Sequence, residues 1–169
     1  MTNVRLARPD DLRTLPSIER SAAALFRDVG LAWVADGETM DAALLAAACR
    51  DQTLWVAVDQ EDVPVGFLVA HTLDGMFHIA EVSVARPYQK RGIGAALVAA
   101  AVGHASRSEF HAVTLTTYRD LAWNGPFYSR QGFVEIDATA AGNGHVRKLR
   151  AEAEAGHDAS RRCVMMKTL

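Results

Sequence analysis

The hydrophobic positions change their period after about residue 50. Before that point, apolar residues recur at helical spacing, as at Leu12, Leu15 and Ile18, behind a short alternating segment at residues 4–6. This pattern predicts one strand followed by two helices. The polar residues just before the two apolar stripes predict an aspartate as the cap of the first helix and Thr39 as the cap of the second.

The next third of the chain alternates between short apolar segments and polar turns. Residues 54–58, 65–71 and 76–84 predict three strands of an antiparallel meander. The remaining elements are then expected as a helix at 93–105, a strand at 112–117, a helix at 121–130, a strand at 132–136, a small surface helix at 149–156 and a strand at 163–166. This order predicts a mixed α/β fold, with residues 1–169 forming a single domain.

Composition narrows the class of protein without identifying its chemistry. Charged residues make up 22% of the 169 residues and the net charge is −2, which argues against disorder and against a nucleic-acid partner. No window reaches about 18 apolar residues, so no membrane partner is expected. Cys49 and Cys163 lack metal-ligand spacing and the N-terminus lacks the apolar core of a signal peptide. We therefore expect a cytoplasmic protein with reduced thiols and no metal.

A short basic loop with two glycines carries the first chemical signal. Gly92 and Gly94 stand where the chain turns into a helix, so first-turn N–H groups and the helix dipole face outward beside Lys90 and Arg91. Such a loop suits a pyrophosphate. It is neither a dinucleotide fingerprint, because Leu97 replaces the third glycine, nor a P-loop, because no Gly-Lys-Ser/Thr follows. The plain alternative is an ordinary turn into a core helix.

The order of residues around this loop adds a resemblance. Gln-Lys-Arg-Gly-Ile-Gly at residues 89–94 resembles the Gln/Arg-x-x-Gly-x-Gly/Ala motif of the GNAT superfamily of N-acetyltransferases, and Glu-Val-Ser-Val at 81–84 is similar to its central strand. Residues 123–133 resemble its second signature, in which a helix with an asparagine and an aromatic pair leads into Gly-Phe. The resemblance spans roughly residues 3–168. It implies a GNAT-type domain whose mostly antiparallel, twisted sheet is splayed between the fourth and fifth strands and flanked by helices.

The resemblance also implies a function and a set of binding residues. It implies an acetyl-CoA-dependent N-acetyltransferase that transfers the acetyl group directly to a primary amine of a small molecule or a peptide. In the family, the loop amides bind the pyrophosphate and the central strand pairs with the pantetheine arm. The implied cosubstrate-binding residues here are Val82, Ser83, Val84, Gln89, Lys90, Arg91, Gly92, Ile93, Gly94, Ala95, Asn124, Phe127 and Tyr128.

Three residues are candidates for proton transfer. Tyr128 takes the position of the family's general acid, which protonates the departing thiolate. The base is Glu81, His78 or no dedicated side chain. These two residues are three apart on one strand, so regular alternation places them on opposite faces, although a bulge changes that phase.

A second function class stays open at this point. A GNAT-type fold can hold an acyl-CoA as a ligand without turnover, as a sensor or regulatory module, because a fold does not establish a function. The sequence does not identify the acceptor amine. A homodimer is possible, because dimers are frequent in the family.

Overall fold

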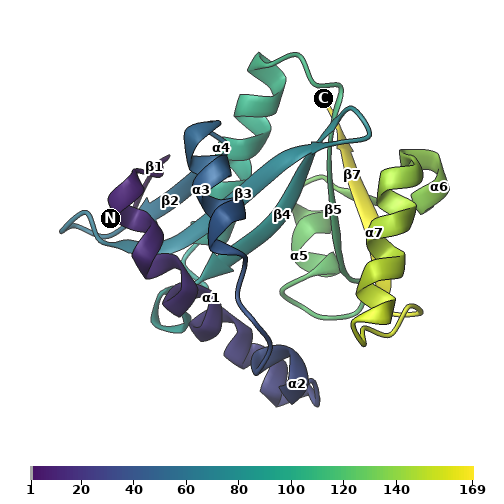
Figure 1. Ribbon diagram of the computed structural model, residues 1–169, viewed down its shortest axis with the longest axis horizontal. Helices are drawn as coiled ribbons and strands as arrows, with labels where there is room; N and C mark the ends of the chain where they lie inside the picture. Colours follow the sequence, from purple (N-terminus) through teal and green to yellow (C-terminus); the bar gives the residue numbers. More distant parts are fainter. Residues whose placement is uncertain (1) are drawn as a thin grey trace. The chain divides into compact units, whose positions relative to one another are not determined.

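The computed structural model describes residues 2–169, and these residues cluster into two compact units. The first unit holds the chain up to Ala70 together with Glu81–Ala101, and the second holds His71–Ala80 and Val102–Leu169. Two strands, β3 (Pro64–Leu73) and β4 (Met76–Val84), contribute residues to both units. The seven strands follow the order β1-β2-β3-β4-β5-β7-β6 (Figure 1). The mixed α/β class is therefore confirmed.

The first unit contains the antiparallel start of the sheet. β1 (Asn3–Leu6) pairs with β2 (Leu54–Val58), which in turn pairs with β3. All five residues of β2 are buried, which explains its continuous apolar sequence. The helical segments of the unit are η1 (Pro9–Thr14), α1 (Leu15–Ala23), η2 (Ala24–Val29), α2 (Ala32–Ala35), α3 (Ala42–Arg50), η3 (Arg86–Tyr88) and the first nine residues of α4 (Ile93–Arg107).

Both predicted helix caps in this unit are wrong. Asp11 is the third residue of η1 rather than its cap, and its carboxylate accepts the Arg8 N–H at 2.7 Å and the Arg5 guanidinium at 2.8 Å. Thr39 is not the cap of α3, because the cap residue directly precedes the helix and bonds the N–H of its second or third residue, which here are Ala43 and Leu44. Asp41 caps α3 instead, with its Oδ1 2.7 Å from the Ala43 amide nitrogen.

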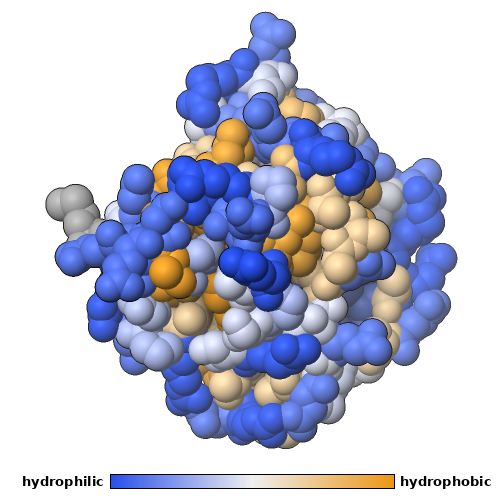
Figure 2. All heavy atoms as spheres, turned by 60° about the vertical axis from the view of Figure 1, so that its left-hand side comes forward, coloured by the Kyte–Doolittle hydropathy of each residue, from blue (hydrophilic) through white to orange (hydrophobic). Residues whose placement is uncertain are grey.

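The surface of the first unit carries scattered apolar side chains. Figure 2 shows groups of hydrophobic residues interrupted by hydrophilic ones on the face it presents. Among the exposed large apolar residues of this unit, Leu44 is 58% exposed and Trp33 is 44% exposed. Single exposed apolar residues are normal on protein surfaces. None of the helices in residues 2–169 combines the length and apolarity that crossing a bilayer requires.

The second unit contains the parallel part of the sheet. β4 pairs in parallel with β5 (Ala112–Tyr118), and β5 pairs antiparallel with β7 (Arg162–Thr168). The β4–β5 ladder joins Phe77–Ile79 to Val113–Leu115, and both strands continue beyond its end. The splay expected between the fourth and fifth strands stays a prediction. The short strand β6 (Val134–Ile136) then pairs with β7 at the sheet edge.

Two predicted helices of the second unit have different bounds. The short helix α5 (Gly125–Arg130) begins four residues later than expected. The expected surface helix at 149–156 is α7 (Asn143–Glu154), which begins six residues earlier and follows a short α6 (Ala138–Ala141). The local sequence, which contains several glycines, does not indicate the start of α7, because the first turn of this helix is capped by an aspartate that is distant in sequence. Figure 1 shows α7 beside β7.

Candidate functional site

In the first unit, the loop before α4 presents backbone donors. Lys90 and Gly92 have φ angles of 61° and 79°, so the chain passes twice through the left-handed region before α4 begins. The Ala96 amide donates to the Gly92 carbonyl at 3.0 Å. The N–H groups at the start of α4, before Ala96, have no acceptor within the helix, because no helical carbonyl lies one turn before them. A Cβ on Gly92 meets nothing within 4 Å, so its glycine serves the φ angle rather than the available space.

Side chains brace this loop and give it positive charge. Gln89 Nε2 donates to the Val84 carbonyl at 2.9 Å, which ties the loop to the end of β4. The Arg91 guanidinium lies 5.5 Å from the centre of the Tyr88 ring. Lys90 and Arg91 are both exposed. Backbone donors at a helix start beside two cations fit a pyrophosphate group.

The end of β4 holds the other predicted residues of the first unit. Ser83 is 2% exposed, and its Oγ donates to Glu81 Oε1 at 3.1 Å, so these two side chains share one side of the strand. Gly66 of β3 allows close packing, since a Cβ there lies 3.0 Å from the Ser83 carbonyl oxygen. Val82 and Val84 are partly exposed.

In the second unit, a tight turn positions the residues of the second motif. Asn124 immediately precedes α5, and its Oδ1 accepts the Tyr118 amide at 3.3 Å. Gly125 is required by close approach, because a Cβ there lies 2.6 Å from the Arg119 carbonyl oxygen. The Phe127 ring stands nearly perpendicular to the Tyr128 ring, with 5.0 Å between their centres. Tyr128 is 9% exposed, so α5 holds its phenol in a largely buried position.

His78, the third predicted proton-transfer residue, belongs to a chain of three side-chain hydrogen bonds that we call the histidine relay. His78 lies opposite Thr114 in the β4–β5 ladder, and its Nδ1 is 2.9 Å from Thr114 Oγ1. Thr114 Oγ1 is 2.7 Å from His145 Nε2, and His145 Nδ1 is 2.7 Å from Asp74 Oδ2. His78, Thr114 and His145 are all fully buried, and Asp74 lies in the turn between β3 and β4.

Sequence reasoning missed three of the four relay residues. The missed residues are Asp74, Thr114 and His145. Thr114 and His145 are 31 positions apart in the sequence, and Asp74 and His145 are 71 positions apart. No local pattern joins them. The available signal was the pair of glycines around position 143, which admit the Asp74 carboxylate to the start of α7.

The electrostatics of the relay favour an anion at one end and a neutral ring at the other. The hydrogen bond from His145 lowers the pKa of Asp74, and the His145 and Gly144 amides act in the same direction. Burial lowers the pKa of His78 to about 2, and the charge of Lys148 contributes to that shift. Asp74 is therefore ionised and His78 neutral near pH 7.

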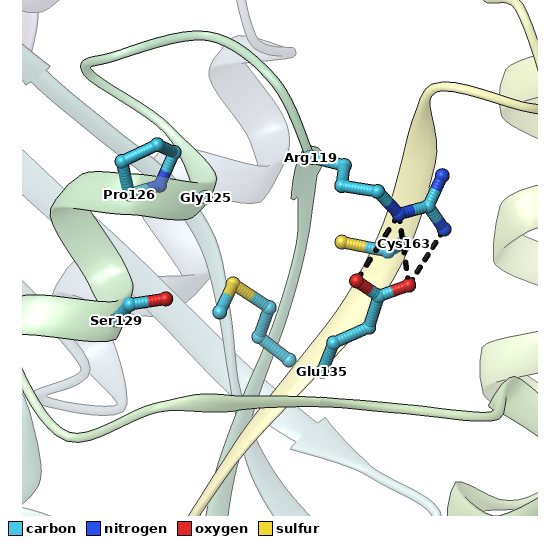
Figure 3. Close-up of a pocket in the computed structure, with 7 residues that line it drawn as sticks. Arg119, Gly125, Pro126, Ser129, Glu135 and Cys163 are labelled. Carbon is cyan, nitrogen blue, oxygen red and sulfur yellow. Dashed lines mark hydrogen bonds and ion pairs between the residues drawn. The ribbon is translucent and has the colours of Figure 1, made fainter.

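A small pocket in the second unit lies beside the second motif. Gly125, Pro126 and Ser129 line one side, and the Arg119–Glu135 ion pair lines the other (Figure 3). Its volume is about 170 Å³. Pockets for drug-sized ligands have about 300–1,000 Å³. Burial raises the pKa of Cys163, which also lines this pocket, to about 11, so its thiol stays protonated.

The predicted residues fall into two groups. Residues 81–84 and 89–95 belong to the first unit, where the braced loop follows the end of β4. His78, Asn124, Phe127 and Tyr128 belong to the second unit.

Comparisons with known proteins identify the family of this chain and structures with a similar fold. A family model described as the acetyltransferase (GNAT) family matches residues 20–133. Among solved structures, the coenzyme A complex of PaiA N-acetyltransferase from Thermoplasma acidophilum has a TM-score of 0.73 at 15% identity, over 100% of this chain and 99% of that one. Rv2747 from Mycobacterium tuberculosis, in complex with CoA and NLQ, has a TM-score of 0.70 at 21% identity, over 99% of both chains. The ribosomal-protein-S18-alanine N-acetyltransferase from Escherichia coli has a TM-score of 0.67 at 14% identity, over 99% of this chain and 94% of that one.

Proposed function

Because this chain belongs to the acetyltransferase (GNAT) family, we propose that it transfers the acetyl group of acetyl-CoA directly to a primary amine. Family membership makes the chain an acyltransferase with acetyl-CoA as its cosubstrate. The observation that carries the proposal is the loop before α4, where Gly92 turns the backbone amides outward beside Lys90 and Arg91. Backbone Gln89–Ala95 would hold the pyrophosphate, and Val82–Val84 would pair with the pantetheine arm.

Residues of the second motif would act near the reacting thioester. In this proposal Asn124 contacts the pantetheine arm and Phe127 packs beside it. Tyr128 donates its phenolic proton to the sulfur as the C–S bond breaks. The phenol suits this task, because an un-ionised tyrosine has an O–H proton to donate.

Direct transfer is supported by the state of the buried thiol beside the second motif. Cys163 is 4% exposed and has a pKa of about 11, so it carries no thiolate that could attack a thioester. The amine itself then attacks the carbonyl carbon. We propose a small-molecule or peptide amine as the acceptor, because both classes present a primary amine.

Two measurements test the proposal. Isothermal titration with acetyl-CoA should give saturable binding, and no binding at high micromolar concentration would reject it. Thiol release should then be measured with phenethylamine, cadaverine, glutamine and a peptide with an N-terminal alanine. Release with at least one of these amines is expected. Binding without any release would instead assign the chain as an acyl-CoA-binding module.

A further inference from the structure

The histidine relay has a fixed hydrogen-bond direction when His145 is neutral. An ionised carboxylate only accepts hydrogen bonds, so Asp74 makes His145 Nδ1 the donor. His145 Nε2 then has a lone pair and accepts the Thr114 hydroxyl. The Thr114 oxygen in turn accepts from His78 Nδ1. Each donor therefore points toward Asp74, and the far ring nitrogen, His78 Nε2, is left with a lone pair.

That last nitrogen is the exception in an otherwise satisfied network. Within residues 2–169, His78 Nε2 is buried and has no hydrogen-bond partner. A buried polar atom without a partner costs stability, and native structures contain few of them. The relay thus prepares an unprotonated nitrogen that still requires a proton donor.

We propose that Asp74, His145 and Thr114 are positioning residues that make His78 the general base of acetyl transfer. This inference rests on the function proposed above, and it selects His78 over Glu81. Because the His78 ring has no exposed surface, the amine cannot contact Nε2 directly, and the proposal therefore has its proton reach Nε2 through one water molecule.

The proton balance closes along the relay. As the amine forms its N–C bond and the C–S bond breaks, the amine nitrogen loses one proton, which enters at His78 Nε2. His78 Nδ1–H passes its proton to Thr114 Oγ1, and the Thr114 hydroxyl passes its own to His145 Nε2. His78 ends as the neutral Nε2–H tautomer and His145 as an imidazolium beside Asp74. Tyr128 protonates the thiolate and is left as a phenolate, and the proton held on His145 balances that charge until exchange with solvent restores both residues.

The surroundings explain why the charge settles at the distant end of the relay. Burial and Lys148 both oppose a positive charge on His78. The other titratable groups that face it are His71, His145 and Asp74. At His145 the same charge lies 2.7 Å from the Asp74 carboxylate, an attractive ion pair. His78 can therefore act as a base although it does not hold a positive charge itself, because the relay moves that charge to His145.

The start of α7 is shaped around that carboxylate. Asp74 Oδ1 accepts the Gly144 amide at 3.0 Å and Oδ2 accepts the His145 amide at 2.9 Å. A Cβ on Gly142 would lie 2.5 Å from Asp74 Cγ, and a Cβ on Gly144 would lie 2.9 Å from its oxygens. Three hydrogen bonds therefore hold the carboxylate that orients the His145 ring.

The tautomer of His78 tests the relay without requiring turnover. In the full chain with ¹⁵N-labelled histidine, two-bond proton–nitrogen spectra at pH 7.5 should show His78 as the neutral Nδ1–H tautomer. Thr114→Ser, which keeps the hydroxyl, should leave that tautomer in place, and Thr114→Val should lose it. A wild-type His78 in the Nε2–H tautomer would overturn the inference.

Kinetics with acetyl-CoA and the fastest amine of the panel above test the catalytic role. Thr114→Val should lower kcat about 100-fold, a typical contribution of general-base catalysis, with KM for acetyl-CoA changed less than about twofold. Thr114→Ser should retain most of kcat, and Glu81→Gln should lower kcat less than Thr114→Val does. A folded Thr114→Val enzyme with wild-type kcat would overturn the inference and leave the proposed transfer intact. If the wild-type chain transfers to no amine, the proposed function fails while the tautomer result still stands by itself.

Discussion

The loop before α4 presents backbone N–H groups beside exposed cations, whereas the histidine relay joins the buried side chains of His78, Thr114 and His145 to the carboxylate of the exposed residue Asp74. The loop needs one left-handed glycine and a glutamine brace, and its donors come from the backbone whatever the side chains are. In the relay, each hydrogen bond sets the direction of the next. A site built from backbone donors therefore tolerates single substitutions at a local cost, while a network of hydrogen-bonded side chains is lost as a whole when one member is replaced.

The largest expected effect comes from Thr114, one of two buried threonines of β5. Thr114→Val leaves His145 Nε2 and His78 Nδ1 without their bridging hydroxyl, and we expect a loss of about 2–4 kcal/mol in the free energy of unfolding. Thr117 is the matched control, because its buried hydroxyl has no hydrogen-bond partner among the described residues. Thr117→Val should be neutral or stabilising by up to about 1 kcal/mol. Urea denaturation of both variants checks this, and equal losses would contradict it.

The second effect concerns the phenol of α5. Tyr128→Phe removes the proposed proton donor and keeps the ring, so packing against Phe127 and Phe133 is preserved. We expect kcat to fall about 100-fold, since general-acid catalysis contributes at that scale. The acetyl-CoA dissociation constant should change less than about twofold. Unchanged turnover would exclude Tyr128 as the acid.

A smaller effect is expected from substituting Gly92 or Gly30, two glycines with similar left-handed backbone angles. Gly92→Ala and Gly30→Ala both place a Cβ in open space at φ angles of 79° and 77°. Each should cost about 1 kcal/mol of stability through the left-handed backbone. Only Gly92→Ala should weaken acetyl-CoA binding in a titration, by about fivefold, a factor equivalent to about 1 kcal/mol. Equal affinities of the two variants for acetyl-CoA would place the cosubstrate away from this loop.

The smallest effect is the dependence of stability on acid. The pKa of Asp74 is lower in the folded chain than in an unfolded one. Its contribution to stability is therefore present above the unfolded pKa of about 3.9 and is lost as the pH falls through the lower folded value. Asp74→Asn should lose less stability than wild type between pH 5 and about pH 2, measured by thermal unfolding. A parallel loss in both proteins would contradict the assignment.

The same contrast explains what the sequence can predict. The mixed α/β order, the antiparallel meander and the loop at Gly92 follow from local periods and from glycine chemistry, which neighbouring residues determine. The Asp41 cap and the early start of α7 do not, because the first depends on where the helix begins and the second on Asp74. His78 was a candidate base from its type and strand, but its partners became apparent only when β4, β5 and α7 were placed together.

The contact between Asp74 and α7 also has a consequence for the order of folding. Asp74 lies 71 positions before His145, and it caps the first turn of a helix whose own sequence gives a weak start. A contact across so many residues forms slowly, because a long loop must close before it is made. During synthesis the β3–β4 hairpin leaves the ribosome well before α7 does. The first turn of α7 should therefore become protected against amide hydrogen exchange late in refolding, after the hairpin has already closed.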